Sequence, residues 1–334
     1  MKAAILEGYS QPLRLVDLPV PVPGPGEILI RLEVSGVCHS DVHIWKGETR
    51  PTAAPDPFVL GHEGVGTVAA LGAGVLSWQV GERAGVAWLH DTCGICDQCR
   101  AGQENFCAAQ RAQGFDMPGT FAEYVVAKAD FAAKVPAGEA AALAPLMCAG
   151  LTAFGALERA ALSHGETCAI FGCGGLGLYA VQLATRRGAR VVAVDTDPAK
   201  LQMARQMGAV ATELSRPGLA ETWPQALRAH VSINFAPTSR VWPAIQAATR
   251  PLGRIVAAAM VSEPVALSQE WLTWTGITVT GTSVGSRAQM ADLMRLHAAQ
   301  PLVSAVEVIR LSDVSDALAA LDQGQAKMRY CVKF

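Results

Sequence analysis

The glycine-rich turn GCGGLG constrains the fold of this chain more than any other segment. It follows the apolar run TCAIF and precedes LGLYAVQLATRRG, whose apolar spacing is typical of a helix. Gly172, Gly174 and Gly177 form the pattern G-x-G-x-x-G, which permits a tight turn, close backbone approach to a pyrophosphate and close packing of helix on strand. Asp195 ends the next apolar run, where a carboxylate can bind a ribose 2′-hydroxyl. In this context the turn predicts a dinucleotide site, and the carboxylate favours NAD over NADP.

The sequence around this turn alternates between strand-like and helix-like segments. RVVAV is followed by PAKLQMARQMG, a predicted helix that Pro198 begins and Gly208 ends. VSINF, GRIVAAA and GITVTG continue the series. Such alternation predicts an α/β fold with a doubly wound parallel sheet, in a domain of residues 149–283.

The segments on either side of this domain have a different character. The first ~145 residues contain many glycines, prolines and short β-type runs such as EILIRLEVSG, which predict a β-rich domain with many turns. The tail AVEVIRLSDVSDALAALDQGQAKMRYCVKF predicts a short helix and a final strand. We therefore expect a first domain of residues 1–148 that is rejoined by about 284–334.

Four cysteines lie close together in DTCGICDQCRAGQENFC, which we call the four-cysteine loop. The spacing C-x2-C-x2-C-x7-C of Cys93, Cys96, Cys99 and Cys107 can close a tetrahedral thiolate shell around zinc, with no position left for substrate. An iron–sulfur cluster is the alternative, because the first three cysteines match the start of a ferredoxin run. The fourth cysteine comes after seven residues instead of three and no proline follows it, which favours a structural zinc ion.

Composition narrows the remaining function classes. The 334 residues carry a net charge of −2 with no basic run, which argues against nucleic-acid binding, and no stretch of ~18 apolar residues predicts a membrane span. The segment MKAAILEGYSQP lacks the features of a secretory signal, so we expect a cytoplasmic protein. In a reducing compartment, clustered cysteines more often bind metal or act in catalysis than form disulfides.

Several further motifs occur along the chain in the order found in a known enzyme family. GVCHSDVHIWKGE, GHEGVGTV, the four-cysteine loop, APLMCAGLTAFGAL and GCGGLG followed by Asp195 together resemble the zinc-dependent alcohol dehydrogenases of the medium-chain dehydrogenase/reductase superfamily. The resemblance extends over the whole chain. It implies a GroES-like catalytic domain, a Rossmann domain for NAD, and two zinc ions per chain, one catalytic and one structural.

The resemblance also implies roles for individual residues. Cys38, His62 and Cys148 match the ligands of the catalytic zinc, a Cys₂His set with one open position. Glu63 matches a carboxylate beside that metal, Asp41 one that orients the histidine ligand, and Ser40 with His43 a proton relay. The implied cofactor contacts are His39, Thr152, Gly172, Gly174, Gly175, Leu176, Gly177, Asp195, Lys200 and Arg329.

Trp88 and Trp45 match positions that line the substrate cleft in this family. Together with a cysteine at position 148, they favour primary alcohols and aldehydes, with secondary alcohols and ketones as a further class. One alternative is a relative acting on a polyol or hydroxyacyl substrate, and a remote one is a zinc-ribbon binding module. By analogy with the family we expect a homodimer or homotetramer, with its subunit contact around GITVTGTSV.

Overall fold

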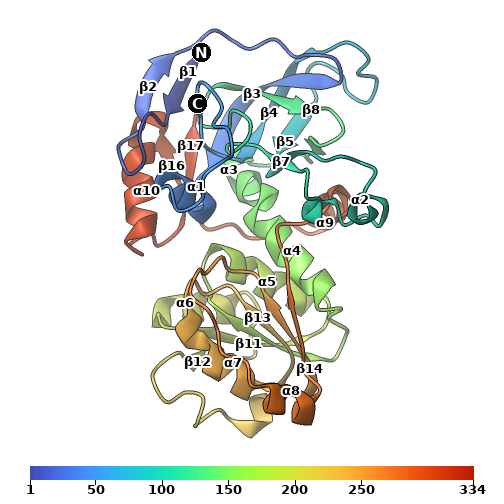
Figure 1. Ribbon diagram of the computed structural model, residues 1–334, viewed down its shortest axis with the longest axis vertical. Helices are drawn as coiled ribbons and strands as arrows, with labels where there is room; N and C mark the ends of the chain where they lie inside the picture. The colour runs from blue at the N-terminus through green and yellow to red at the C-terminus, as the bar shows by residue number, and fades with distance from the viewer. The chain divides into compact units, whose positions relative to one another are not determined.

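The computed structural model describes residues 1–334, which divide into two compact units (Figure 1). The first unit comprises Met1–Leu151 and Ser286–Phe334, and the second comprises Thr152–Gly285. These boundaries lie within three residues of those expected from the sequence.

A seven-stranded sheet forms the centre of the first unit. Its order is β16 (Val306–Arg310), β17 (Arg329–Lys333), β3 (Glu27–Gly36), β4 (Glu63–Leu71), β5 (Arg83–Val86) and β9 (Ala133–Lys134), with β8 (Tyr124–Lys128) also paired to β3. Two smaller sheets pair β1 (Lys2–Ile5) with β2 (Arg14–Asp17) and β6 (Leu89–Asp91) with β7 (Arg111–Ala112). The helices are α1 (His39–Trp45), α2 (Asp97–Arg100), α3 (Ala140–Leu143), α9 (Arg287–Ala299) and α10 (Val314–Asp322).

The tail of the chain returns to this sheet. In Figure 1 the red strand β17 lies beside the blue strand β3, and the two pair antiparallel with Cys331 opposite Gly36. Side chains of β3 at Ile28, Ile30 and Leu32 face a buried apolar cluster shared with β4, β5 and β8. The burial of this cluster fixes the register of β3, because a one-residue slip would turn its apolar side chains to the other face.

The second unit contains a six-stranded sheet in which every pair is parallel. Its order is β12 (Ala211–Leu214), β11 (Arg190–Asp195), β10 (Thr167–Phe171), β13 (Ala229–Asn234), β14 (Thr249–Ala257) and β15 (Thr278–Gly281). Its helices are α4 (Ala149–Arg159), which begins just before the boundary, α5 (Gly175–Arg186), α6 (Pro198–Gln206), α7 (Trp242–Ala248) and α8 (Gln269–Thr275). The predicted doubly wound parallel sheet is confirmed. Its chain order reverses at β10, next to the glycine-rich turn.

No single helix is long and apolar enough to cross a membrane. The bent pair of segments 140–147 and 149–159 together has the length and the apolar composition of a membrane span. The side chains of this pair are mostly buried within the protein.

Candidate metal centre and cofactor loop

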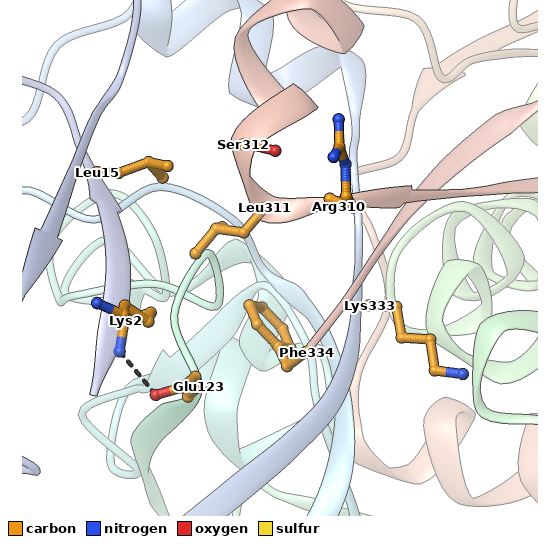
Figure 2. Close-up of a pocket in the computed structure, with 8 residues that line it drawn as sticks. All are labelled: Lys2, Leu15, Glu123, Arg310, Leu311, Ser312, Lys333 and Phe334. Atoms are coloured by element: carbon orange, nitrogen blue, oxygen red, sulfur yellow. Dashed lines mark hydrogen bonds between the residues drawn. The ribbon is translucent and has the colours of Figure 1, made fainter.

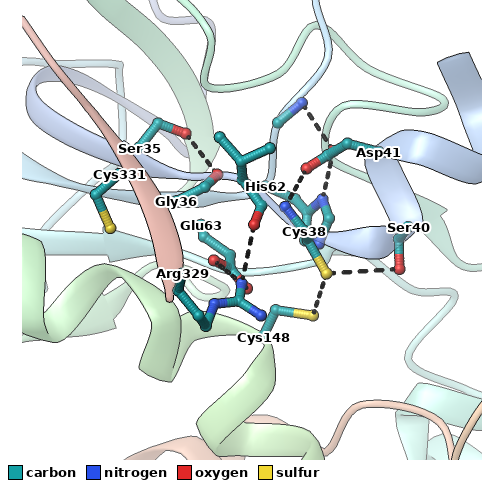
Figure 3. A network of polar contacts seen from close by, with 12 residues as sticks. Ser35, Gly36, Cys38, Ser40, Asp41, His62, Glu63, Cys148, Arg329 and Cys331 are labelled. Atoms are coloured by element: carbon teal, nitrogen blue, oxygen red, sulfur yellow. Dashed lines mark hydrogen bonds and ion pairs between the residues drawn. The ribbon is translucent and has the colours of Figure 1, made fainter. Parts of the chain in front are cut away.

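Four potential metal ligands from three separate segments meet in the first unit, and we call them the buried cluster: Cys38, His62, Glu63 and Cys148 (Figure 3). One ligand atom from each lies within 4.8 Å of the others, and all four residues are buried. Cys38 is the N-cap residue of α1, and Glu63 begins β4. The sulfurs of Cys38 and Cys148 lie 3.9 Å apart, close to the ~3.8 Å between two thiolates on one tetrahedral zinc ion.

The state of His62 tests whether a metal fits here. Its Nδ1 lies 3.1 Å from Oδ1 of Asp41, whereas its Nε2 is buried and has no hydrogen-bond partner. A carboxylate only accepts hydrogen bonds, so Asp41 requires a proton on Nδ1 and leaves Nε2 as the ring atom that can bind a metal. A buried ring nitrogen without a partner is costly unless it binds a metal, so the donor set fits zinc.

Asp41 also joins the two segments that supply the first ligands. It is completely buried, and it accepts hydrogen bonds from the backbone N–H of Cys38 at 2.8 Å and of Gly61 at 3.2 Å. One carboxylate therefore fixes the start of α1, the approach to β4 and the ring of His62. The role implied for Asp41 by the family resemblance agrees with this geometry.

The charges of the buried cluster also favour a cation. The hydrogen bond with Cys148 holds the pKa of Cys38 well below its usual range, and the same bond raises the pKa of Cys148. Burial raises the pKa of Glu63 to about 7, even though the positive charge of Arg329 opposes this shift. Groups that can carry negative charge are thus held together out of water, where a divalent cation would stabilise their ionised forms.

Arg329 binds Glu63 directly through its guanidinium group, and both side chains lie in the first unit (Figure 3). Its Nη2 also donates to the Val37 carbonyl at 3.3 Å. Gly36 leaves room for this ion pair, because a Cβ there would lie 2.1 Å from Oε2 of Glu63. The family resemblance assigns Arg329 to the cofactor phosphates; the structure adds a buried carboxylate partner.

The residues of the expected relay lie on α1. The Ser40 hydroxyl lies 3.8 Å from the Cys38 sulfur, at the edge of the buried cluster. The rings of His39 and His43 are in edge-to-face contact, with centroids 5.3 Å apart. Burial lowers the pKa of His39.

The two candidate substrate tryptophans have different surroundings. The Trp88 ring stands perpendicular to His62 with centroids 5.1 Å apart, and Phe115 stacks on Trp88 at 6.0 Å. The Trp45 indole N–H donates to the Gln11 carbonyl at 2.6 Å, and the rings of both tryptophans pack against the same core cluster. The structure therefore brings Trp88 beside His62 of the buried cluster and bonds Trp45 to the N-terminal segment.

The four-cysteine loop gathers its thiols around a short helix and a turn. The ligand atoms of Cys93, Cys96, Cys99 and Cys107 lie within 4.8 Å of one another. Cys93 is exposed and Cys107 is buried. Hydrogen bonds from the backbone N–H groups of Ile95 and Cys96 lower the pKa of Cys93 to about 6, which favours a thiolate ligand.

The glycine-rich turn of the second unit connects β10 to α5. Gly172 has φ +89°, and a Cβ at Gly177 would lie 1.9 Å from the Gly172 carbonyl oxygen. Nothing lies within 4 Å of a Cβ placed at Gly174, the N-cap residue of α5. The turn therefore combines tight helix packing with open space at the N-terminus of a long helix, which fits a pyrophosphate.

Asp195 lies at the end of β11 and is held by backbone donors. Its carboxylate accepts from the N–H groups of Cys173 at 2.7 Å and Asp197 at 2.9 Å. Among the other expected cofactor contacts, Gly175 and Leu176 form the first turn of α5, Lys200 lies in α6, and Thr152 is buried in α4.

A separate pocket of about 260 Å³ lies in the first unit between the N-terminal strands and the tail (Figure 2). It contains none of the predicted site residues. Some of its polar groups already have partners within the chain: the Lys2 backbone donates to Glu123, and Arg310 pairs with Asp313.

Comparison with known proteins assigns this arrangement to a family. Residues 24–137 match the alcohol dehydrogenase GroES-like domain, and residues 175–299 match the zinc-binding dehydrogenase domain. An alcohol dehydrogenase of Moraxella sp. (strain TAE123) is 34% identical over 100% of this chain and 99% of its own length. The chain belongs to the zinc-dependent alcohol dehydrogenases.

Solved structures of relatives agree with this family assignment. The cobalt- and zinc-bound thermostable alcohol dehydrogenase from Pyrobaculum aerophilum has a TM-score of 0.90 and 30% identity, covering 100% of this chain and 99% of that chain. The acetophenone reductase from Geotrichum candidum NBRC 4597 in complex with NAD has a TM-score of 0.87 and 32% identity, covering 100% and 97%. Alcohol dehydrogenases are oxidoreductases that use a nicotinamide cofactor on small molecules, so the predicted family, fold class and class of activity are confirmed.

Within this alcohol dehydrogenase framework, two features are not identified by sequence reasoning. Phe115 stacks on Trp88 although it lies in a segment, QGFDMPG, without a recognisable motif. The pairing of Glu63 with Arg329 spans 266 positions. The sequence around Arg329, KMRYCVKF, gives no signal for this partner.

Proposed function

We propose that this enzyme is an NAD-linked dehydrogenase of primary alcohols, with a catalytic zinc ion in the buried cluster and a structural zinc ion in the four-cysteine loop. The unpartnered Nε2 of His62, aimed among two thiols and a carboxylate, is the observation that supports the catalytic site most directly. The four-cysteine loop has four sulfur ligands and so leaves no position for substrate.

The chemistry follows from this assignment. Zinc on Cys38, His62 and Cys148 would act as a Lewis acid toward the alcohol oxygen, and the nicotinamide would accept the hydride. The protein residues have supporting tasks. Asp41 orients His62, Trp88 covers one side of the ligands with an apolar surface, and the remaining proton leaves through the relay of α1.

NAD is favoured over NADP by the position of Asp195. Its carboxylate is fixed by two backbone N–H groups at the end of β11, so it cannot turn away from an approaching 2′-phosphate without losing both bonds. The same group would accept hydrogen bonds from ribose hydroxyls. The NAD complex of the acetophenone reductase relative supports the same choice.

The substrate class follows from the aromatic wall of Trp88 and Phe115. Stacked rings beside His62 favour flat, apolar alcohols over polyols, whose hydroxyl groups would be desolvated there without partners. Benzyl alcohol is therefore expected to be a better substrate than ethanol or xylitol.

An oligomer is also part of the proposal. Strand β15 is one of the two edge strands of the second unit's sheet, and Leu252 and Trp274, on the neighbouring elements β14 and α8, are each 81% exposed in the single chain. We propose that two chains pair at this edge, giving a homodimer or a dimer of dimers. Light scattering after gel filtration measures the oligomeric state, and a monomer at micromolar concentration would contradict the proposed oligomer.

A single set of measurements tests the catalytic proposal. Metal analysis should find two zinc ions per chain, and absorbance at 340 nm should show turnover of benzyl alcohol with NAD well above that with NADP. The panel should include 1-phenylethanol and xylitol. One zinc ion per chain, or a preference for NADP or xylitol, would contradict the respective part of the proposal.

A further inference from the structure

The turn that ends α1 places a carboxylate against the relay histidine. Gly47 has φ +72°, its N–H donates to the Ile44 carbonyl, and the N–H of Glu48 donates to the His43 carbonyl, both at 2.9 Å. This pair of bonds defines a Schellman motif, in which the second residue past the cap contacts a residue in the last turn of the helix. Such contacts usually join two apolar side chains. In this chain the positions are occupied by Glu48 and His43.

The contact between these two side chains is a hydrogen bond. Oε2 of Glu48 lies 2.6 Å from Nδ1 of His43. The hydrogen bonds from His43 and Lys46 lower the pKa of Glu48, so the side chain is ionised near neutral pH. Because a carboxylate can only accept, the bond requires a proton on Nδ1. In neutral His43 the lone pair then lies on Nε2.

Other charged groups hold Glu48 in this position. The ammonium group of Lys46 lies 2.9 Å from Oε1 of Glu48 and 2.9 Å from Oδ1 of Asp322, at the end of α10. The hydrogen bonds to Asp322 and Glu48 raise the pKa of Lys46. On the other side of His43 stands the ring of His39, with ring centroids 5.3 Å apart. His43 therefore faces one carboxylate and one aromatic ring, and the ammonium group of Lys46 is shared by two acids.

We propose that Glu48 is a positioning residue that holds His43 in the Nδ1–H tautomer and so leaves Nε2 to take up the alcohol proton. This inference rests on the proposed relay through Ser40 and His43. In the step concerned, the proton delivered from Ser40 forms a new N–H bond at Nε2. The resulting imidazolium is stabilised by Glu48 and then gives the same proton to water, so His43 returns to its starting tautomer.

The tautomer can be measured without turnover. The zinc-loaded enzyme is labelled with ¹⁵N in its histidine rings, and the two ring nitrogens of His43 are assigned by comparison with His43→Gln. At a pH where His43 is neutral, wild type should show a protonated Nδ1, whereas free histidine prefers a protonated Nε2. Glu48→Ala should revert to the preference of free histidine. Glu48→Gln, whose amide oxygen still accepts, should retain the wild-type tautomer.

The matched control is Glu158→Gln. Glu158 forms an ion pair of similar exposure with Arg187 at 2.6 Å, remote in sequence from α1, so its removal reports the general effect of losing a surface ion pair. In this control both the His43 tautomer and the rate of turnover should equal those of wild type. Thermal unfolding of all variants verifies that they are folded.

The catalytic consequence is measured as proton release in the first turnover, followed with a pH indicator. Glu48→Ala should release protons about two- to five-fold more slowly, the range for an exposed charged pair, while KM for alcohol stays within two-fold. An unchanged His43 tautomer in Glu48→Ala would overturn the inference. The inference would also be overturned if Glu48→Ala released protons at the wild-type rate while His43→Gln released them more slowly. If His43→Gln itself releases protons at the wild-type rate, the relay in the proposed function is wrong, which is a distinguishable result.

Discussion

The four-cysteine loop takes its ligands from fifteen consecutive residues and leaves Cys93 exposed, whereas the buried cluster joins Cys38 to Cys148 across 110 positions and excludes water from every ligand. The loop offers four sulfurs and therefore a closed shell. The buried cluster offers two sulfurs, one unpartnered nitrogen and a carboxylate that is already bound to Arg329. A site assembled by the fold from distant segments can keep a coordination position open, because the scaffold and not the metal holds the ligands apart.

This comparison predicts the largest effect for the removal of a buried ligand. Cys38→Ala should lower kcat/KM by about 10³-fold or more and reduce zinc from two ions to one per chain, because Lewis-acid stabilisation is worth several kcal/mol. NADH absorbance and metal analysis measure both quantities. The control is Cys168→Ala, a buried cysteine of β10 outside either site. Turnover within ten-fold of wild type would show that the chemistry does not depend on the buried cluster.

Removal of a ligand from the four-cysteine loop should act on stability first. Cys99→Ala should lower Tm by about 10 °C, corresponding to ~3 kcal/mol in a protein of this size, because the loop has little apolar core to replace the metal. Turnover should fall in proportion to the folded fraction, measured by circular dichroism and calorimetry. If Tm stays at the wild-type value while turnover disappears, the structural assignment of the loop is wrong.

The buried cluster, unlike the four-cysteine loop, contains a buried carboxyl group whose charge depends on pH. The folded-state pKa of Glu63, about 7, is above the ordinary value of 4.5, so its contribution to stability is complete below pH 4.5 and is lost as pH rises through 7. As pH rises from 4.5 to above 7, the free energy of unfolding of zinc-depleted wild type should therefore fall by at most about 3 kcal/mol more than that of Glu63→Gln. Urea unfolding at a series of pH values measures the difference. Parallel pH profiles for the two proteins would contradict the prediction.

The smallest effect is expected for the reactivity of the loop thiols. Cys93 has its pKa lowered to about 6 by backbone N–H groups, whereas the pKa of Cys96 is raised to about 11, since burial and the neighbouring thiols outweigh a bond to the Cys99 backbone. In zinc-depleted protein at pH 7.5, iodoacetamide should modify Cys93 about ten-fold faster than Cys96, as mass spectrometry of peptides can show. Cys93 is exposed and Cys38 of the buried cluster is buried, so modification of Cys38 before Cys93 would contradict the prediction.

The parts of the fold with local signals could be predicted from the sequence. The turn at Gly172 needs a positive φ and open space for a pyrophosphate, and those requirements select glycines at fixed spacing. The central strands β10, β11 and β13 of the second unit are buried on both faces, so they read as continuous apolar runs such as TCAIF. The ligands proposed for the catalytic zinc were a different case. Cys38, His62 and Cys148 have no mutual spacing rule, and only the family resemblance identified them together.

Contacts between distant segments required the tertiary structure. Nothing near Arg329 in the sequence points to Glu63, because β17 comes to lie beside β3 only when the tail completes the sheet. Phe115 likewise reaches Trp88 by folding of the segment after the four-cysteine loop. Trp88, and after it Trp45, were the candidates for the substrate site in the sequence; the structure puts the Trp88 ring against His62 and the Trp45 indole on the Gln11 carbonyl.

The sequence by itself therefore determined the parallel sheet, the glycine-rich turn and the closed set of four thiols, since each depends on residues a few positions apart whose backbone geometry is set locally. The tertiary structure decided which nitrogen of His62 is bonded to Asp41, which carboxylate pairs with Arg329, and which tryptophan ring lies against His62. These choices depend on burial and on charges brought together across the chain, where removal from water makes each unpaired polar group costly and so selects its partner.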